Sequence, residues 1–521
     1  MGFTRRQFLS LLGASAGASA LPLAVLAKSP FLANSDVVAG LSGIAPNFSD
    51  ALVTASGLTW KLLLKEGDEL AKGLRFGTNN DYLQFFSLEG SKRGILWVNH
   101  EYLTPLLSSK EERTLEVITA EMDMVGGSLI EIHKTAQGWE PIIGSRFNRR
   151  ITAKTIIPFS GGHKILGQEK AIGTLANCAG GITPWGTVLT CEENYDGFYG
   201  ERDRKTGKLL PSEWLQWERF FKHPPEHYGW VVEINPKTGA AKKHVALGRF
   251  AHECATVRVG AGKRPAVYSG DDHNDEHLYK FIADRPQDLS RGTLYVADLA
   301  AGRWIPLVHS DARLKNIFKD QTDVLIHCRE AAKLVGATPL DRPEDIEVDP
   351  YTGDVLVACT NNKKANRPFG KILRLKEAKN DPHALSFTHD VFIAGGEAGG
   401  LACPDNLAFD QKGNLWITTD MSGGDMHKGV MQNFGNNGLF VVMRHGPQAG
   451  IPVQVASAPI DAEFTGPVFS PDGKTLFLSV QHPGELTTDL ANPTSRWPKG
   501  KPLSAVVTIE GPLLNRITGA I

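Results

Sequence analysis

One short pattern recurs along the chain: an alternating apolar strand, a tight turn rich in Asp, Asn, Pro and Gly, and a second strand. Its copies are GWVVEINPKTGA (229–240), EDIEVDPYTGDVLVA (344–358), DNLAFDQKGNLWITT (405–419), GPVFSPDGKTLFLSV (466–480) and, more faintly, GGSLIEIHKTAQGW (126–139). Period-two alternation with turn residues of this kind predicts β-hairpins. The copies centred near Pro350, Gln411 and Pro471 are about sixty residues apart, near the upper end of propeller repeat lengths.

These repeats predict an all-β fold, a six-bladed β-propeller with helical and loop insertions. Propeller blades are four-stranded sheets around a central channel, and six of them would occupy most of the 521 residues. Two segments are expected insertions, SSKEERTLEVITAEMDM (108–124), which has helical periodicity, and PSEWLQWERFFKHPPEHY (211–228). An array of β-sandwiches is the structural alternative. In a propeller, residues remote in sequence can meet at one mouth of the channel.

The first 28 residues have the features of an export signal. The twin arginine Arg5–Arg6 precedes a mildly apolar run that glycines and alanines make too weak for a membrane span. A twin arginine here indicates the Tat route, which carries folded proteins. We therefore expect residues 1–28 to be a signal peptide, cleaved after Ala20 or Ala27, and residues 29–521 to be a single β-propeller domain.

These expectations place the protein in the periplasm or outside the cell, with the Tat translocase as a transient partner and no stable insertion into a membrane. The 56 basic and 57 acidic residues nearly balance, so no overall field attracts nucleic acid, and we expect no such partner. We expect a monomer that acts on small molecules.

Six cysteines lie at wide spacings, and two of them flank one short strand. Because folding would precede export from a reducing cytoplasm, a disulfide framework is not expected, and the absence of CxxC pairs argues against structural zinc. In NCAGGITPWGTVLTCEEN (177–194), Cys178 precedes two glycines and Cys191 precedes Glu192 and Glu193. Either thiol could be a metal ligand, because Cys191 shares a strand face with Glu193, and spacing alone does not choose between them.

Acidic residues recur where predicted strands meet turns. They are Glu101, Glu192, Glu193, Glu253, Asp271, Asp272, Glu276, Glu344, Asp345, Asp405 and Glu463. Carboxylates gathered at one channel mouth would repel one another, so either cations bind there or the acids are protonated. Oxygen ligands select hard cations such as Ca²⁺, whereas a thiolate among them suits iron better.

Basic residues accompany these acids. Arg342 lies two residues before Glu344, and Lys170 lies eight before Cys178. Cations beside a metal cluster are what phosphoryl oxygens require. A salt bridge for Arg342 and a solvated surface charge for Lys170 are the alternatives.

At this point the residues resemble the PhoX-type alkaline phosphatases, bacterial enzymes exported by the Tat route. The collinear motifs extend over nearly the whole chain: VNHEY, SRFNRRITA, the NC…TPWGT…CEEN segment, YGWVVEI, YSGDD, RPED, TNN and TGPVFSPDGKTLFLSVQHPGE. The resemblance implies a six-bladed propeller that hydrolyses phosphate monoesters with a mixed Fe³⁺ and Ca²⁺ cluster at one mouth of the channel.

The resemblance also implies roles for individual residues. Cys178 would be the thiolate on iron, with Glu193, Glu253 and Glu344 as carboxylate ligands of the cluster. Arg342 and Lys170 would hold the phosphate. The candidates for calcium are Glu101, Asp272, Glu276, Asp405 and Glu463.

Two other functions stay open at this stage. A calcium-dependent lactonase or organophosphate esterase on a similar propeller would need only calcium and carboxylates. A non-catalytic binding propeller would use the acids to hold structural calcium. Dependence on iron distinguishes the phosphatase from the first, and any turnover of a phosphate ester distinguishes it from the second.

Overall fold

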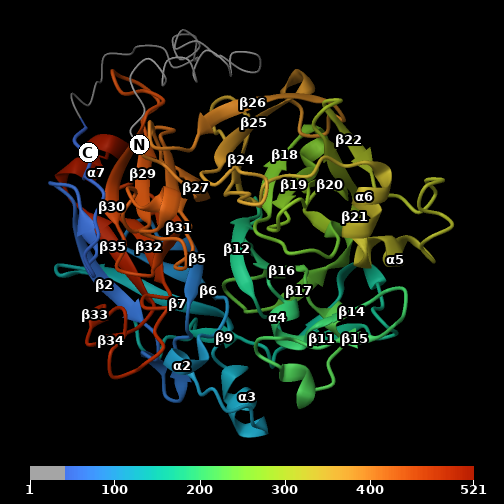
Figure 1. The fold of residues 1–521 in the computed structure, drawn as a ribbon, viewed down its shortest axis with the longest axis horizontal. Coiled ribbons are helices and arrows are strands. Elements are labelled where there is room, and N and C mark those ends of the chain that lie inside the picture. Colours follow the sequence, from blue (N-terminus) through green and yellow to red (C-terminus); the bar gives the residue numbers. More distant parts are fainter. Residues whose placement is uncertain (1–40, 521) are drawn as a thin grey trace, which may run out of the picture.

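Six antiparallel sheets surround a central channel in the computed structural model, which describes residues 41–520 (Figure 1). The prediction of an all-β, six-bladed β-propeller is confirmed, and the β-sandwich alternative is wrong. Neighbouring blades meet through their first strands, as in the contacts of β5 with β12 and with β31. The first strand of each blade therefore lines the channel.

The first three blades hold residues 80 to 306. Blade 1 consists of β5 (Asn80–Glu89), β6 (Arg93–His100), β7 (Gly126–Thr135) and β8 (Gly138–Pro141), and β9 (Arg149–Ile151) pairs with β7. Blade 2 consists of β12 (Asn177–Ile182), β13 (Val188–Glu192), β16 (Val231–Ile234) and β17 (Ala241–His244). Blade 3 consists of β18 (Thr256–Val259), β19 (Pro265–Gly270), β20 (Leu278–Arg285), β21 (Asp288–Asp298) and β22 (Arg303–Pro306).

The last three blades draw on both ends of the described chain. Blade 4 consists of β23 (Pro343–Val348), β24 (Val355–Cys359), β25 (Lys371–Glu377) and β26 (Phe387–Ala394). Blade 5 consists of β27 (Pro404–Phe409), β28 (Leu415–Thr419), β29 (Gly438–Val442), β30 (Pro452–Ser457) and β1 (Val53–Thr54). Blade 6 consists of β31 (Glu463–Phe469), β32 (Leu476–Gln481), β35 (Ala505–Glu510) and β2 (Thr59–Lys65), so an early strand closes the ring (Figure 1).

The remaining elements are short hairpins and helices that do not belong to the six blade sheets. The small hairpins are β3 (Glu69–Ala71) with β4 (Leu74–Arg75), β10 (Ile156–Pro158) with β11 (Lys170–Ile172), β14 (Glu201–Arg202) with β15 (Leu209–Leu210), and β33 (Pro498–Lys499) with β34 (Lys501–Pro502). The helices are α2 (Pro105–Ser108), α3 (Leu115–Glu121), α4 (Asp196–Tyr199), α5 (Gln321–Ile326), α6 (Cys328–Val335) and α7 (Pro512–Thr518). Among residues 41–520, no helix is both long and apolar enough to cross a membrane.

The repeated hairpin pattern occupies two different places in a blade. The copies in 344–358, 405–419 and 466–480 form the first two strands of blades 4, 5 and 6, whereas those in 126–139 and 229–240 form the third and fourth strands of blades 1 and 2. Side chains close the turns as the residue types predict: the Oδ1 atom of Asp349 accepts the N–H groups of Tyr351 and Thr352.

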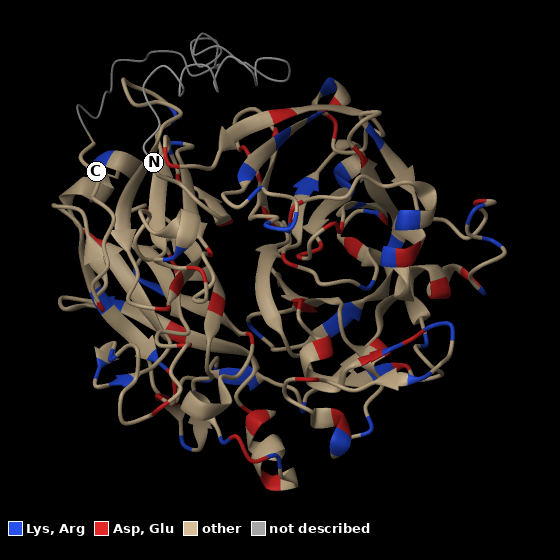
Figure 2. Ribbon diagram, in the orientation of Figure 1, with Lys and Arg blue, Asp and Glu red and all other residues tan. Residues whose placement is uncertain are grey.

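The two predicted insertions both connect the second strand of a blade to the third. Residues 108–124 lie between β6 and β7 and contain α3, whose N-cap Thr114 accepts the N–H group of Val117. Residues 211–228 lie between β13 and β16 and are mostly irregular. All second-to-third connections emerge at the same mouth of the channel. Lys and Arg are interspersed with Asp and Glu over the described part of the ribbon (Figure 2), in agreement with the balanced charge.

Candidate metal centre

The first strand of every blade, or the segment just before it, brings one carboxylate or thiol side chain of a kind that can bind metal to the same mouth of the channel. These side chains stand at, or just before, the start of the channel-lining strand: Asp81 on β5, Cys178 on β12, Glu253 ahead of β18, Glu344 on β23, Asp405 on β27 and Glu463 on β31. Six positions remote in sequence thereby become neighbours around one cavity.

The backbone enters these strands in a repeated, strained conformation. A residue with positive φ stands two positions before five of the six ligands: Asn79 (38°), Ala176 (53°), Arg342 (53°), Cys403 (52°) and Asp461 (58°). The strand pairing then shifts across a bulge that contains Asp81, Cys178, Glu344 or Asp405. A β-bulge re-aims side chains beside functional sites, and left-handed non-glycine residues cluster where a site requires them.

Cys178 is held in its bulge by polar contacts from the neighbouring blade. Asn99, next to the end of β6, donates from Nδ2 to the carbonyl of Ala179 at 3.0 Å, and its Oδ1 accepts the hydroxyl of Thr190 at 2.7 Å. The glycines that follow permit close packing, because a Cβ on Gly180 would lie 2.4 Å from the carbonyl oxygen of Leu189. The NCAGG stretch therefore fixes the thiol at the channel mouth.

A second ring of side chains comes from the ends of the second strands. Each follows its strand by one or two residues: Glu101 after β6, Glu193 after β13, Asp272 after β19, Asp420 after β28 and His482 after β32. Together the two rings line a cavity of ≈200 Å³. Its lining has ten carboxyl groups, namely Asp81, Glu101, Glu193, Glu253, Asp272, Glu344, Asp405, Asp420, Glu463 and Glu485, and one guanidinium group, that of Arg342.

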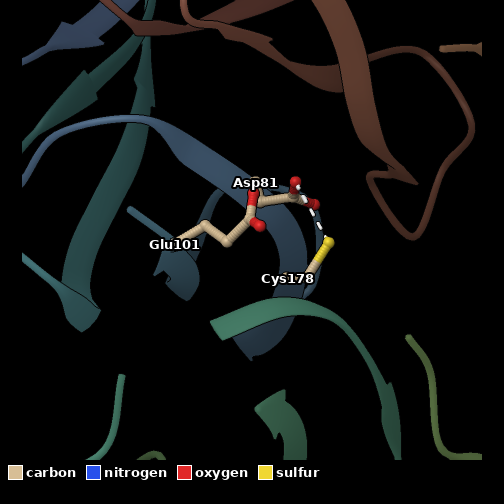
Figure 3. Close-up of side chains that lie close together, drawn as sticks. All are labelled: Asp81, Glu101 and Cys178. Carbon is tan, nitrogen blue, oxygen red and sulfur yellow. Dashed lines mark hydrogen bonds between the residues drawn. The ribbon is translucent and has the colours of Figure 1, made fainter. Parts of the chain in front are cut away.

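Three overlapping sets of ligand atoms lie within 4.8 Å of one another in this cavity. The sets are Asp81, Glu101 and Cys178; Cys178, Glu193 and Glu253; and Glu253, Glu344 and Asp405. Figure 3 shows the first set, in which the three side chains converge from different strands. The sulfur of Cys178 lies 3.7 Å from an oxygen of Asp81 and 3.4 Å from one of Glu253. Since Cys178 and Glu253 each belong to two sets, neighbouring ions there would share ligands.

The carboxyl groups of the cavity far outnumber its positively charged side chains. Burial, together with the charges of Glu344 and Glu193, raises the pKa of Glu253 well above its usual value. Burial and the charge of Asp420 raise the pKa of Glu463 to about 8. Buried oxygens of Asp81 (Oδ1) and Glu253 (Oε2) have no hydrogen-bond partner, which is costly unless a ligand binds them. Hard cations with one thiolate-tolerant metal fit this donor set.

Arg342 is the cation among these acids. Its Nε and Nη2 atoms donate to the two oxygens of Asp272 at 2.9 and 2.8 Å, and Nη2 lies 2.7 Å from Glu344. Burial alone would raise the pKa of Asp272, but the charge and hydrogen bonds of Arg342 hold it below its usual value. The side chain of Arg342 is 22% exposed, so the guanidinium can reach a bound anion.

A histidine network forms one side of the cavity. His482 donates from Nδ1 to the carbonyl of Asp461 at 2.8 Å, and its Nε2 lies 3.2 Å from Glu463. Burial opposes its protonation, but the charges of Glu485 and Glu463 raise the pKa of His482 well above its usual value. Glu485 in turn accepts the hydroxyl of Tyr102 at 2.8 Å.

The structure brings most of the sequence-predicted site residues into this cavity. Those that line it are Arg342, Cys178, Glu193, Glu253, Glu344, Glu101, Asp272, Asp405 and Glu463. Cys191 instead lies buried in a hydrophobic cluster with Trp230 and Val231, so the thiol beside the carboxylates is that of Cys178. All six cysteines are unpaired thiols.

Two predicted residues lie outside the cavity lining. Lys170 is exposed on β11, where it pairs with Pro158 of β10, and the irregular segment 173–176, with positive φ at Gly173 and Ala176, separates this hairpin from β12. Closeness in sequence to Cys178 therefore does not bring Lys170 to the cavity. Glu276 is ion-paired with Lys333 of α6 and lines a different part of blade 3.

Seven residues of the cavity lining were not predicted from the sequence: Asp81, Tyr102, Asn194, Asp420, Ser422, His482 and Glu485. Asp420 directly follows the strand residues of LWITT, so the rule that found Glu193 would also have found it. Asp81 stands in TNNDYLQF at the start of an alternating strand, a position that periodicity alone marks as ordinary. His482 and Glu485 belong to the QHPGE motif already noted for the family resemblance.

Comparison with known proteins agrees with this geometry. A family model described as alkaline phosphatase PhoX matches residues 39–484. The solved structure of Pseudomonas fluorescens PhoX in complex with vanadate, a transition-state analogue, is 30% identical in sequence and covers 93% of this chain and 100% of that one, with a TM-score of 0.82.

More distant solved structures share less. A Dyadobacter fermentans protein of unknown function (8% identity, 88% of this chain and 100% of that one) has a TM-score of 0.38. A Xanthomonas campestris gluconolactonase (9% identity, 84% and 97%) has a TM-score of 0.32. Curated proteins give no match. On the family match and the propeller that carries the cavity, this chain belongs to the PhoX family of alkaline phosphatases, which are metal-dependent phosphatases.

Proposed function

We propose that this protein hydrolyses phosphate monoesters at the channel mouth, with iron and calcium held by the two rings of side chains. The observation that carries the proposal is the overlap of three ligand sets on Cys178 and Glu253, beside the only guanidinium in the cavity lining. A calcium-only lactonase or esterase has no need of a thiolate, and a binding propeller has no need of Arg342 in the cavity.

The donor types suggest how the ions would be distributed. The thiolate of Cys178, with Glu193, Glu253 and Glu344, would hold iron, because sulfur is a soft ligand. The oxygen-only positions would hold calcium, and they include Asp81, Glu101, Asp405, Glu463 and Asp272. Once bound, such cations neutralise the carboxylates and act as Lewis acids on phosphoryl oxygens.

Arg342 would bind and orient the phosphoryl group. Its planar fork matches two oxygens of a phosphate, and Asp272 fixes the plane of that fork through two parallel hydrogen bonds. The charge of Arg342 then adds to transition-state stabilisation without reorganisation at the moment of reaction. Binding of vanadate by Pseudomonas fluorescens PhoX supports the expectation that this cavity accommodates a phosphoryl transition state.

We also propose a periplasmic or secreted monomer exported by the Tat translocase, with small phosphate esters as substrates. The support is the twin arginine Arg5–Arg6, which lies outside the described residues. Folded export suits a centre whose ligands come from all six blades, because the site exists only after folding.

The test is metal analysis of the purified protein together with its rate on 4-nitrophenyl phosphate, bis(4-nitrophenyl) phosphate and a lactone. We expect iron and calcium in the protein, fast monoester hydrolysis, little diester hydrolysis and no lactone hydrolysis. Vanadate should inhibit, and a chelator should abolish activity until Ca²⁺ is restored. Turnover of the lactone alone would favour the lactonase, and no turnover of any substrate would favour a binding propeller.

A further inference from the structure

The cavity has a buried floor and a partly open aromatic side. Its metal-ligating acids are buried, whereas Tyr102, Asn194, Ser422 and Glu485 are intermediate or exposed. A phosphoryl group bound near Arg342 would therefore direct the rest of its ester toward this outer rim. The rim decides which leaving groups find favourable contacts.

Trp214 stands beside this rim and is exposed. Of the ten tryptophans of the chain, it is the only one in the exposed class, at 40%. Its ring centroid lies 5.2 Å from that of Tyr102, with 57° between the planes, and 6.4 Å from that of Phe198. Exposing a Trp ring to water is unfavourable, and the other nine tryptophans are buried or partly buried.

Packing and hydrogen bonds fix the position of Trp214. Its ring packs on Gly197 of α4, where an added Cβ would lie 2.8 Å from the ring. The hydroxyl of Ser212 donates to the carbonyl of Gly197 and accepts the N–H group of Trp214 at 3.1 Å. The segment that carries Trp214 is anchored by buried Leu215 and Trp217 in a hydrophobic cluster with Phe198.

Tyr102 is equally fixed, with its ring toward the cavity. Glu485 accepts its hydroxyl hydrogen, and the His482 ring lies 6.1 Å away. With the hydroxyl group engaged, what Tyr102 offers a ligand is the ring. Tyr102 lines the cavity, and Trp214 packs beside Tyr102 just outside the lining, so the two rings form an aromatic surface that continues outward from the cavity.

We propose that Tyr102 and Trp214 form a leaving-group subsite that favours planar aromatic groups, such as aryl or nucleobase-bearing esters, over small aliphatic ones. The inference rests on the proposed phosphatase function and specifies its substrate class. Aromatic pairs prefer offset or edge-to-face contact, and stacking on a planar ring is tolerant of its identity. Binding energy of this kind, remote from phosphorus, contributes to specificity.

The experiment compares Trp214→Leu, Trp214→Phe and the control Tyr351→Leu with the wild type. Tyr351 is also an exposed aromatic residue, at 62%, but it lies in the β23–β24 turn, whereas Trp214 contacts Tyr102 of the cavity lining. We expect Trp214→Leu to lower kcat/KM for phenyl phosphate roughly three- to tenfold and to leave that for glycerol phosphate within twofold. Trp214→Phe should retain most of the phenyl phosphate rate, and Tyr351→Leu should change neither rate.

A binding measurement separates this proposal from the phosphatase proposal itself. Calorimetric titration with the non-hydrolysable phenylphosphonate and methylphosphonate should show tighter binding of the phenyl compound, and Trp214→Leu should remove that preference. If wild-type protein hydrolyses neither ester, the phosphatase function fails while the titration still reports on the subsite. Equal effects of Trp214→Leu on both esters, or no phenyl preference in the titration, would overturn the subsite.

Discussion

The guanidinium of Arg342, on the approach to blade 4, donates to both carboxylate oxygens of Asp272, at the end of a blade 3 strand, at 2.9 and 2.8 Å. Arg342 also has a φ of 53°, so its backbone and its side chain are both held in unusual but fixed states. One blade therefore orients the cation that the next blade provides.

Replacing Arg342 with Lys should reduce kcat/KM for a phosphate monoester by about 100-fold, because Lys cannot form the two-pronged pair with Asp272 or with phosphate. Vanadate should bind more weakly in the same variant. The matched control is Arg367→Lys: Arg367 also has a two-pronged pair, with Asp341, but outside the cavity lining. Equal losses in both variants would contradict a role for Arg342 in phosphate binding.

Cys178→Ser should lose iron and most activity, since an oxygen ligand replaces a soft thiolate at a position shared by two ligand sets. A thiolate on ferric iron absorbs visible light, so we expect the wild type to be coloured and the variant to be bleached. Cys191→Ser is the control, because Cys191 is buried in the core. The Cys191→Ser variant should be less stable but should keep iron and colour. If Cys191→Ser loses iron and colour while Cys178→Ser keeps both, the ligand is Cys191.

Glu253→Gln should stabilise the protein after metal removal while weakening metal binding. In the metal-free state a buried carboxyl oxygen without a partner is replaced by a neutral amide among like charges, a gain of about 1 kcal/mol. In the metal-loaded state the variant lacks the carboxylate ligand of Glu253 and binds metal more weakly. This loss of metal-binding free energy outweighs the gain. Urea unfolding with and without chelator measures both effects. Glu233→Gln, which breaks a buried pair with His244, should destabilise both states.

Changing Arg5 and Arg6 to Lys should leave the protein in the cytoplasm, because the Tat route requires the arginine pair. Fractionation of cells with an antibody against the protein measures this. Export at the normal rate by the Sec route would refute the Tat proposal and leave the enzymatic proposals untouched.

Stability should fall in mild acid in a way that depends on His227. Burial, with the charge of Lys243 nearby, lowers the pKa of His227 to about 4, against about 6.5 unfolded. The unfolded state therefore binds more protons between these values, so this stabilisation is complete above pH 6.5 and declines as pH falls toward 4. It amounts to on the order of 2 kcal/mol after allowance for screening.

His227→Phe removes this titration while it keeps an aromatic ring against Phe159. Urea unfolding at pH 7 and pH 4.5 should show a smaller loss in the variant than in the wild type. Both proteins are compared in chelator, so that the titration of the acidic cavity is common to them. Parallel pH curves for the two proteins would count against the assignment.

The sequence predicted the propeller because hairpins are local. Turn residues such as Asp349 and Gly353 specify a hairpin wherever it stands, so the number and spacing of copies indicated the architecture. The acids were found by a local rule as well, since Glu101, Glu193 and Asp272 each follow a strand directly. Both inferences needed only neighbouring residues.

The features of the site that the sequence did not predict depend on the conformation of the backbone. Ala176, Arg342 and Cys403 are not residue types that favour positive φ, so nothing in their identity marks the repeated entry into the channel-lining strands. Strand alternation alone could not distinguish Cys178 from Cys191 as the thiol at the site. The bulge that contains Cys178 is a backbone feature that alternation does not predict. Lys170 shows a related limit: it is only eight residues from Cys178 in sequence, but the irregular segment 173–176 lies between them and Lys170 does not line the cavity.

The shared sheet of blade 6 also imposes an order of events. Strand β35 lies between β32 and β2, so the early strand has no partner in that blade until residues 505–510 have been synthesised. Asp81 and Glu463 stand on β5 and β31, the two channel-lining strands that meet at this junction. The proposed Tat export would therefore require the chain to be complete and the ring closed before transport, an order that suits a route for folded proteins.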